Sequence, residues 1–163
     1  MRRILIVMLS FVLLCTFPQA VSAAELSPRD REYLIHAVAS SYPDVGFGGR
    51  VGICAVVLRR IEDDRFPDTA AEVIAYFGDG CFGDHHTPDE KVLRLTRDAL
   101  DMVFQGADPT VNALYFTILD DGAPIYDLLF DNSGEKQRDR AVGNYARFCT
   151  AVIDGIGFWQ NQP

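Results

Sequence analysis

The chain has 163 residues and a formal net charge of −8 at neutral pH, and 48% of its residues are hydrophobic. This length suits one domain with a single core, once an N-terminal segment is set aside. The acidic balance argues against nucleic acid and anionic membrane surfaces as partners, because both are bound through basic patches. A polysaccharide partner is not excluded by charge.

The first 24 residues have the pattern of a secretory signal peptide. Arg2 and Arg3 form a basic start, residues 4–17 are apolar, and small residues precede Ala24. A retained membrane anchor is less favoured, because the apolar run is shorter than the roughly 20 residues that span a bilayer. We therefore expect cleavage, an exported domain of residues 25–163, and no membrane contact afterwards.

Three cysteines follow the signal segment: Cys54, Cys81 and Cys149. In an exported protein an odd number indicates one disulfide and one spare thiol, or no disulfide at all. Cys54 lies inside an apolar run, where a small buried side chain is expected. The pair that remains for a disulfide is Cys81 with Cys149.

Helical patterns occupy the first part of the mature chain. A helix over residues 29–41 starts with Ser27 as N-cap and has Tyr33, Leu34, Ala37 and Val38 on its inner face. A glycine-rich loop over 46–49 leads to a central buried helix over 51–61, and a short helix over 70–76 is capped by residues 67–69. Residues 77–87 form a polar loop.

The next helix runs to Gln105, with Thr87 as its cap and Glu90 at the capping-box position. Its inner face is expected to carry Val92, Leu95, Ala99, Met102 and Val103.

Strand patterns follow, at residues 113–118, 124–130 and 145–152, with Asp121-Gly122 as a turn signal. The strand over 145–152 is expected to pair with the first. Phe158-Trp159 near the C-terminus is interpreted as a tail that closes the core, or as a glycan contact. Helices first and strands later predict an α+β domain.

Several blocks, taken in chain order, resemble one known family. They are residues 38–61 with the run GFGGRVGICAVVL, residues 65–74 (RFPDTAAEVI), Asp98-Ala99-Leu100, Asp108-Pro109-Thr110 leading into Ala113-Leu114-Tyr115-Phe116, and Val142-Gly143-Asn144-Tyr145 with Phe148. These blocks resemble the SleB-type, spore cortex-lytic cell-wall hydrolases. The resemblance covers about residues 33–149.

The resemblance implies a lysozyme-like helical body with a small antiparallel sheet, which holds a peptidoglycan glycan strand in a groove. It also implies an exported, cell-wall-associated protein. Members of this family cleave between N-acetylmuramic acid and N-acetylglucosamine, commonly as lytic transglycosylases. That reaction needs one carboxylic acid whose pKa is raised by an apolar pocket. We expect no cofactor and no metal.

One residue departs from the family at the position of that acid. The family's glutamic acid lies ten residues before the valine that opens the apolar helix, and counting back from Val51 gives Ser41. A serine hydroxyl is far too weak an acid near neutral pH, and general acid–base catalysis contributes roughly 10²–10⁴-fold. Arg59, in place of an Asn, and Gly78-Asp79, in place of Gln-Phe, also depart from the family pattern.

These departures leave three hypotheses open. The chain is a hydrolase with a displaced acid, a catalytically silent glycan-binding or regulatory relative, or a secreted domain without a peptidoglycan role. Asp44 is the candidate replacement acid, and its alternative role is a turn residue. Asp79 and Asp84, in the loop expected to form the opposite wall, are weaker candidate acids, and their alternative role is a solvated loop charge. Asp79 is also a candidate glycan contact.

Tyr42, Tyr115 and Tyr145 are candidates for sugar stacking, and each has a core role as the alternative. Two other chemistries have less support. Ser41 as a nucleophile lacks the surrounding G-x-S-x-G pattern. Zinc-ligand residue types gather in the polar loop, but in no spacing typical of a zinc site: Asp79, Cys81, Asp84, His85 and His86.

Overall fold

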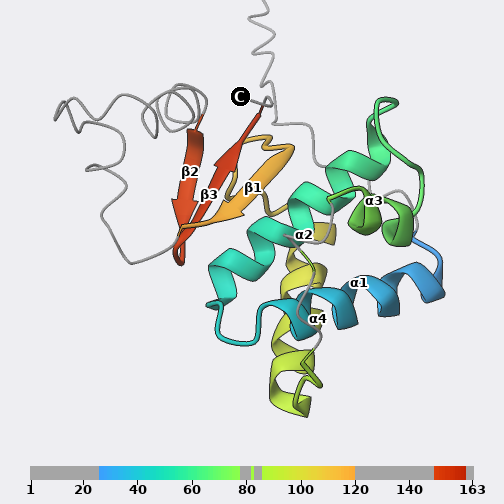
Figure 1. The fold of residues 1–163 in the computed structure, drawn as a ribbon, viewed down its shortest axis with the longest axis vertical. Coiled ribbons are helices and arrows are strands. Elements are labelled where there is room, and N and C mark those ends of the chain that lie inside the picture. The colour runs from blue at the N-terminus through green and yellow to red at the C-terminus, as the bar shows by residue number, and fades with distance from the viewer. Residues whose placement is uncertain (1–25, 78–81, 83–85, 120–148, 161–163) are drawn as a thin grey trace, which may run out of the picture.

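The structure, a computed structural model, describes residues 26–77, 82, 86–119 and 149–160. Within these ranges the chain forms helices first and strands afterwards, which confirms the predicted α+β class (Figure 1). The sheet lies at one side of the helical body, beside the long helix α2. The elements are α1 (Pro28–Ser41), α2 (Phe47–Glu62), α3 (Ala70–Tyr76), α4 (Glu90–Phe104), β1 (Tyr115–Ile118), β2 (Cys149–Ile153) and β3 (Ile156–Trp159).

Side-chain caps start three of the helices. The Ser27 hydroxyl accepts a hydrogen bond from the Asp30 amide at 3.1 Å, and Thr69 caps α3 in the same way, as predicted. For α4 the predicted cap was wrong by two residues, because Asp89 rather than Thr87 accepts from the Val92 amide, at 2.8 Å. A carboxylate directly before the first helical residue caps it better than a hydroxyl two positions further away.

Helix α2 begins at Phe47, so the predicted loop over 46–49 and the predicted start at Val51 were wrong. Gly46 is the N-cap and offers no side chain, but the carboxylate of Asp154 accepts from the Gly49 amide at 2.7 Å. A Cβ on Gly46 would lie 2.5 Å from the same carboxylate. The glycines therefore leave room for an acid that is distant in sequence to cap this helix.

The sheet has the order β1-β3-β2 with both pairings antiparallel, so β3 is its central strand. The prediction that the strand near Cys149 pairs with the first strand was wrong. Phe158-Trp159 closes the core, as interpreted, but it does so as part of the central strand β3 rather than as a tail. Asp154 and Gly155 both have positive φ and form the two-residue turn between β2 and β3, a turn type typical of Asp-Gly. The predicted strand over 124–130, Asp121-Gly122 and residues 145–148 lie outside the described residues.

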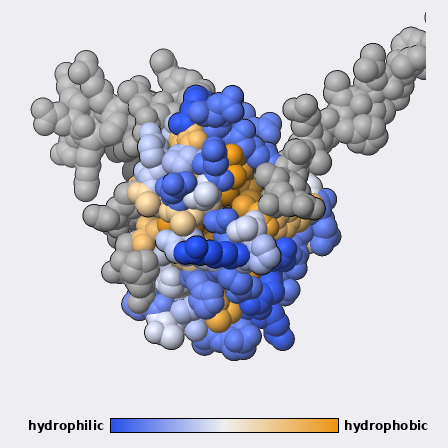
Figure 2. All heavy atoms as spheres, turned by 90° about the vertical axis from the view of Figure 1, so that its right-hand side faces the viewer, coloured by the Kyte–Doolittle hydropathy of each residue, from blue (hydrophilic) through white to orange (hydrophobic). Residues whose placement is uncertain are grey.

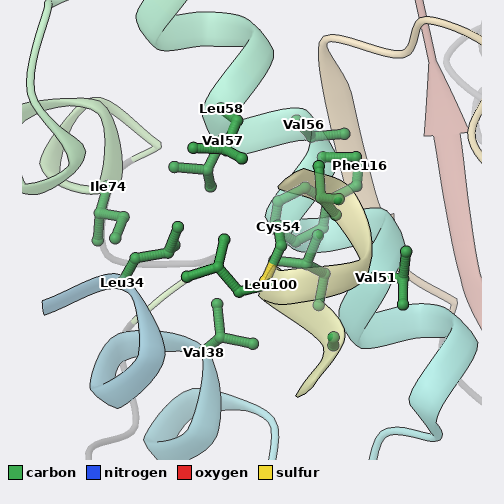
Figure 3. Close-up of a cluster of buried hydrophobic side chains, with 14 of the residues drawn as sticks. Leu34, Val38, Val51, Cys54, Val56, Val57, Leu58, Ile74, Leu100 and Phe116 are labelled. Atoms are coloured by element: carbon green, nitrogen blue, oxygen red, sulfur yellow. The ribbon is translucent and has the colours of Figure 1, made fainter. Parts of the chain in front are cut away.

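Helix α2 is the centre of the core, as predicted. Its side chains are buried almost all round, and residues from α1, α3, α4 and β1 surround them (Figure 3). Cys54 is fully buried among Leu34, Val38 and Leu100. At Gly52 the helix backbone contacts the sheet directly, because a Cβ there would lie 2.4 Å from the ring of Phe158.

Two residues predicted to face inward do not. Tyr33 in α1 is 46% exposed and Met102 in α4 is 41% exposed. In each helix the buried face is centred on residues next to the predicted ones. The reason is that α1 packs between α3 and α4, and α4 packs mainly on α2. The buried residues are Leu34, Ile35, Val38, Ala39 and Ser40 in α1, and Thr96, Ala99, Leu100 and Val103 in α4.

The Asp108 carboxylate organises the segment between α4 and β1. It accepts hydrogen bonds from the Thr110 hydroxyl at 2.6 Å and amide at 3.0 Å, from the Asn112 amide at 2.9 Å, and from Arg59 at 2.6 Å. Arg59 also donates to the Ala113 carbonyl at 3.1 Å. These bonds hold Val111 and Asn112 at positive φ and direct the chain into β1. Arg59 thus has a structural role in the fold.

We expect Asp108→Asn to lower the free energy of unfolding by about 2–3 kcal/mol, because it breaks a largely buried ion pair and its hydrogen bonds. Burial raises the pKa of Asp108, but hydrogen bonds from Thr110 and Asn112 and the charge of Arg59 lower it overall. Its stabilisation is therefore present above the unfolded pKa of about 3.9 and is lost as the pH falls through the lower folded pKa. Urea unfolding between pH 3 and 7 measures both effects.

The matched control is Asp63→Asn, which removes the carboxylate of an ion pair whose Arg65 side chain is 62% exposed. It should change stability little, because solvent screens such pairs. Equal losses of unfolding free energy in the two variants would contradict the role of Asp108. So would a stability difference between Asp108→Asn and the wild type that stays constant as the pH falls below about 4.

Gly52→Ala should destabilise the protein by about 1–3 kcal/mol, because the added methyl group meets the Phe158 ring. The same substitution at a free helix position stabilises by about 0.5–1 kcal/mol, so the sign of the change is diagnostic. The midpoint of urea unfolding measures it. A higher midpoint would mean that α2 and β3 are not in close contact at Gly52.

Candidate functional site

Ser41, which the sequence resemblance places at the position of the family acid, is the last residue of α1. Its Oγ is buried and has no hydrogen-bond partner among the residues that the structure describes. The neighbouring Ser40 differs, because its hydroxyl donates to the His36 carbonyl at 2.7 Å. Buried hydroxyls are nearly always paired, so Ser41 is an exception for which a packing role alone gives no reason.

The buried side chain of Arg50 holds the C-terminal end of α1 in place. Its side chain is 1% exposed, and it donates to the carbonyls of Tyr42 and Pro43, both at 2.8 Å, and to the Thr96 hydroxyl at 2.9 Å. A cation at a helix C-terminus is stabilised by the helix dipole. Burial lowers the pKa of Arg50, while interactions with Cys54 and Asp44 oppose this. The sequence analysis missed Arg50, although a lone arginine in an apolar run was a usable signal.

An aromatic cluster begins at the residue after Ser41. Tyr42 is 7% exposed, and its ring centre lies 5.5 Å from that of Phe82 and 6.0 Å from that of Phe116, both in edge contacts. Phe77 also contacts Phe82, at 5.4 Å. Tyr42 is therefore a core residue, which was the alternative to a role in sugar stacking. Ser41, the residue before it, adjoins an apolar region.

Asp44 is exposed and lies in the turn between α1 and α2. The Val45 amide donates to the Tyr42 carbonyl at 3.4 Å and closes that turn around Pro43 and Asp44. Asp44 is thus a turn residue in the described structure, and its carboxylate does not lie in an apolar pocket there.

The polar loop after α3 reaches the same end of α1. The His86 amide donates to the Ser40 carbonyl at 3.3 Å, and Phe82 inserts its ring between those of Tyr42 and Phe77. Asp79, Cys81, Asp84 and His85 lie outside the described residues, as does Tyr145. His86 is exposed, and no metal-binding group of three ligand residues occurs within the described ranges.

The cysteines have different surroundings. Burial raises the pKa of Cys54 to about 12, which fits its predicted role as a small buried side chain. Cys149 is a half-buried thiol on β2, and burial raises its pKa as well. The disulfide between Cys81 and Cys149 stays a prediction, because Cys81 is not among the described residues.

A second buried arginine holds the far end of the aromatic cluster. The guanidinium of Arg60 lies 3.6 Å from the ring centre of Phe77, 4.6 Å from that of Tyr115 and 4.7 Å from that of Phe66, and its Nε donates to the Leu114 carbonyl at 2.5 Å. Cation–π contacts of this kind fix the rings in place. Tyr115, a candidate for sugar stacking, is half-buried with this cation on its ring. The sequence analysis missed Arg60 too.

Among the described residues, no helix is both long enough and apolar enough to cross a membrane. Comparison with known proteins adds information on the fold. Neither a protein-family model nor a curated protein sequence matches the chain.

Two solved structures are similar to this chain. The catalytic domain of the Bacillus cereus SleB protein is 23% identical with a TM-score of 0.55, over 86% of this chain and 97% of that one. The catalytic domain of the germination-specific lytic transglycosylase SleB from Bacillus anthracis is 24% identical with a TM-score of 0.52, over 83% and 98%. The chain therefore has the α+β fold of the SleB catalytic domain, as the sequence resemblance implied.

Proposed function

We propose that this chain is an exported, peptidoglycan-directed protein that binds a glycan strand at the end of α1 and lacks the general acid of its structural relatives. The shared fold with SleB catalytic domains supports the substrate class, since one of them is described as a lytic transglycosylase. The signal-like segment at residues 1–24 supports export.

The observation that carries the proposal is the unpaired, buried hydroxyl of Ser41. Ser41 directly precedes Tyr42, the first ring of the aromatic cluster, and burial among apolar groups raises the pKa of a carboxylic acid. A general acid in a glycosidase needs this kind of environment. A buried serine at the position where the resemblance puts the acid favours binding without cleavage.

The hydrolase with a displaced acid is the alternative, and it depends on Asp44. This carboxylate is exposed in a closed turn rather than set against apolar side chains. A general acid must reach the glycosidic oxygen and hold its proton near neutral pH. Neither requirement is supported by the position of Asp44, so we rank this alternative second.

Ser41→Glu should give the protein glycan-cleaving activity, or raise a weak one by at least roughly tenfold, because general acid–base catalysis contributes about 10²–10⁴-fold. Ser41→Gln is the matched control, since it has the same size but cannot transfer a proton. Mass analysis of the muropeptides released from purified peptidoglycan measures the difference.

Binding to sacculi should be retained in both Ser41 variants. Equal product from Ser41→Glu and Ser41→Gln would show that the side chain at this position does not act as the acid. A Ser41→Glu variant that neither cleaves nor binds, while remaining folded, would contradict the proposed location of the site.

The wild-type protein should sediment with purified sacculi and release few or no anhydro-muropeptides, because Ser41 cannot protonate the leaving oxygen. Asp44→Asn should change neither result. If the wild type releases anhydro-muropeptides and Asp44→Asn abolishes them, Asp44 is the displaced acid and the alternative function is correct.

A further inference from the structure

We propose that a pocket between the first turns of α1 and α3 binds a zwitterionic head group, with an ammonium and a carboxylate on one carbon. We assign this group to the stem peptide of peptidoglycan, at the end of a diamino-acid side chain. The assignment to the stem peptide rests on the proposed function, whereas the chemistry of the head group follows from the pocket. The pocket is separate from the site at the end of α1, because Ser41 lies roughly 20 Å away along the helix axis.

The pocket brings together residues that are distant in sequence. It has a volume of about 400 Å³, within the range of about 300–1,000 Å³ that is typical of small-molecule sites. Its lining includes Arg29, Asp30 and Tyr33 from α1 and Glu72 from α3. The starts of these two helices lie on the side of the molecule that Figure 2 shows, where hydrophilic side chains surround a band of hydrophobic ones.

Three charged side chains of the pocket have no ionic partner. Arg29, Asp30 and Glu72 make no ion pair with any residue that the structure describes. The Ser27 hydroxyl donates to Asp30 Oδ2 at 2.6 Å. The Thr69 hydroxyl donates to Glu72 Oε2 at 2.7 Å. Helix capping therefore occupies one oxygen of each carboxylate, and within the described ranges the other oxygen is open to a ligand.

This set of groups matches an ammonium beside a carboxylate. Two carboxylates that line one pocket repel each other, and an ammonium between them relieves the repulsion and donates to their remaining oxygens. Tyr33 is 46% exposed, and its ring offers the same ammonium a cation–π contact. The guanidinium of Arg29 matches the carboxylate of the head group. A neutral sugar has neither charge, so the pocket selects the peptide part of peptidoglycan over the glycan.

The mature chain should bind a stem tripeptide that ends in diaminopimelic acid, and Glu72→Gln should weaken this binding about three- to tenfold. The substitution removes one negative charge from the ammonium contact, and it keeps an oxygen that accepts from the Thr69 hydroxyl. Acetylation of the side-chain amine of the peptide should weaken binding at least as much, because it removes the ammonium. Isothermal titration measures these affinities.

The matched control is Glu32→Gln, the same change on α1 at a side chain that is 55% exposed and outside the pocket lining. Its affinity for the tripeptide should equal that of the wild type. A tripeptide with lysine in place of diaminopimelic acid keeps the ammonium and loses the neighbouring carboxylate. The wild type should bind it more weakly, and Arg29→Gln should bind the two tripeptides equally.

Unchanged tripeptide binding by a folded Glu72→Gln, or an equal loss in Glu32→Gln, would overturn the role of the pocket. Free diaminopimelic acid that binds as tightly as the tripeptide would overturn the assignment to the stem peptide. If the wild type sediments with sacculi but binds no tripeptide, the pocket inference fails and the proposed function stands. If the wild type binds neither, both fail.

Discussion

The buried guanidinium of Arg50 is the interaction on which the arrangement of the candidate site depends. Its three described hydrogen bonds go to two carbonyls at the end of α1 and to a hydroxyl of α4, so one side chain of α2 fixes two other helices. A buried cation without such partners would cost several kcal/mol. The end of α1, with Ser41 and the following turn, is therefore held rigidly whether or not the site is catalytic.

Helix α2 extends this constraint to the rest of the molecule. Near its start the Gly49 amide donates to the carboxylate of Asp154 in the turn between β2 and β3, and in its middle Gly52 contacts Phe158. Near its end Arg59 and Arg60 donate to carbonyls of the segment that leads into β1. The helical body and the sheet thus share one central element. None of these contacts involves Ser41, so they do not depend on the residue at that position.

The sequence predicted those features that depend on local patterns. The first cap at Ser27, the buried character of α2 and the α+β order followed from residue spacing, and the family blocks predicted the fold that the SleB structures confirm. The start of α2 could not be predicted, because its cap comes from Asp154, far away in sequence. The turn at Asp154-Gly155 was a readable signal that the analysis overlooked in favour of Asp121-Gly122.

The candidate site was predicted less completely than the fold. The position of Ser41 followed from counting along the helix, but its unpaired hydroxyl, the core position of Tyr42 and the two buried arginines depend on tertiary packing. Arg59 illustrates the difficulty. As a departure from a family pattern it suggested an altered cleft, whereas its contact with Asp108 shows that it supports the fold.

The full burial of Cys54 has a consequence for the thiol chemistry of the chain. Burial raises the pKa of this thiol to about 12, so it is protonated at neutral pH, and only the thiolate attacks a disulfide. Once the core has formed around α2, Cys54 is thus withdrawn from thiol–disulfide exchange. Oxidation at the more accessible thiol of Cys149 therefore does not trap the central helix in a wrong bridge.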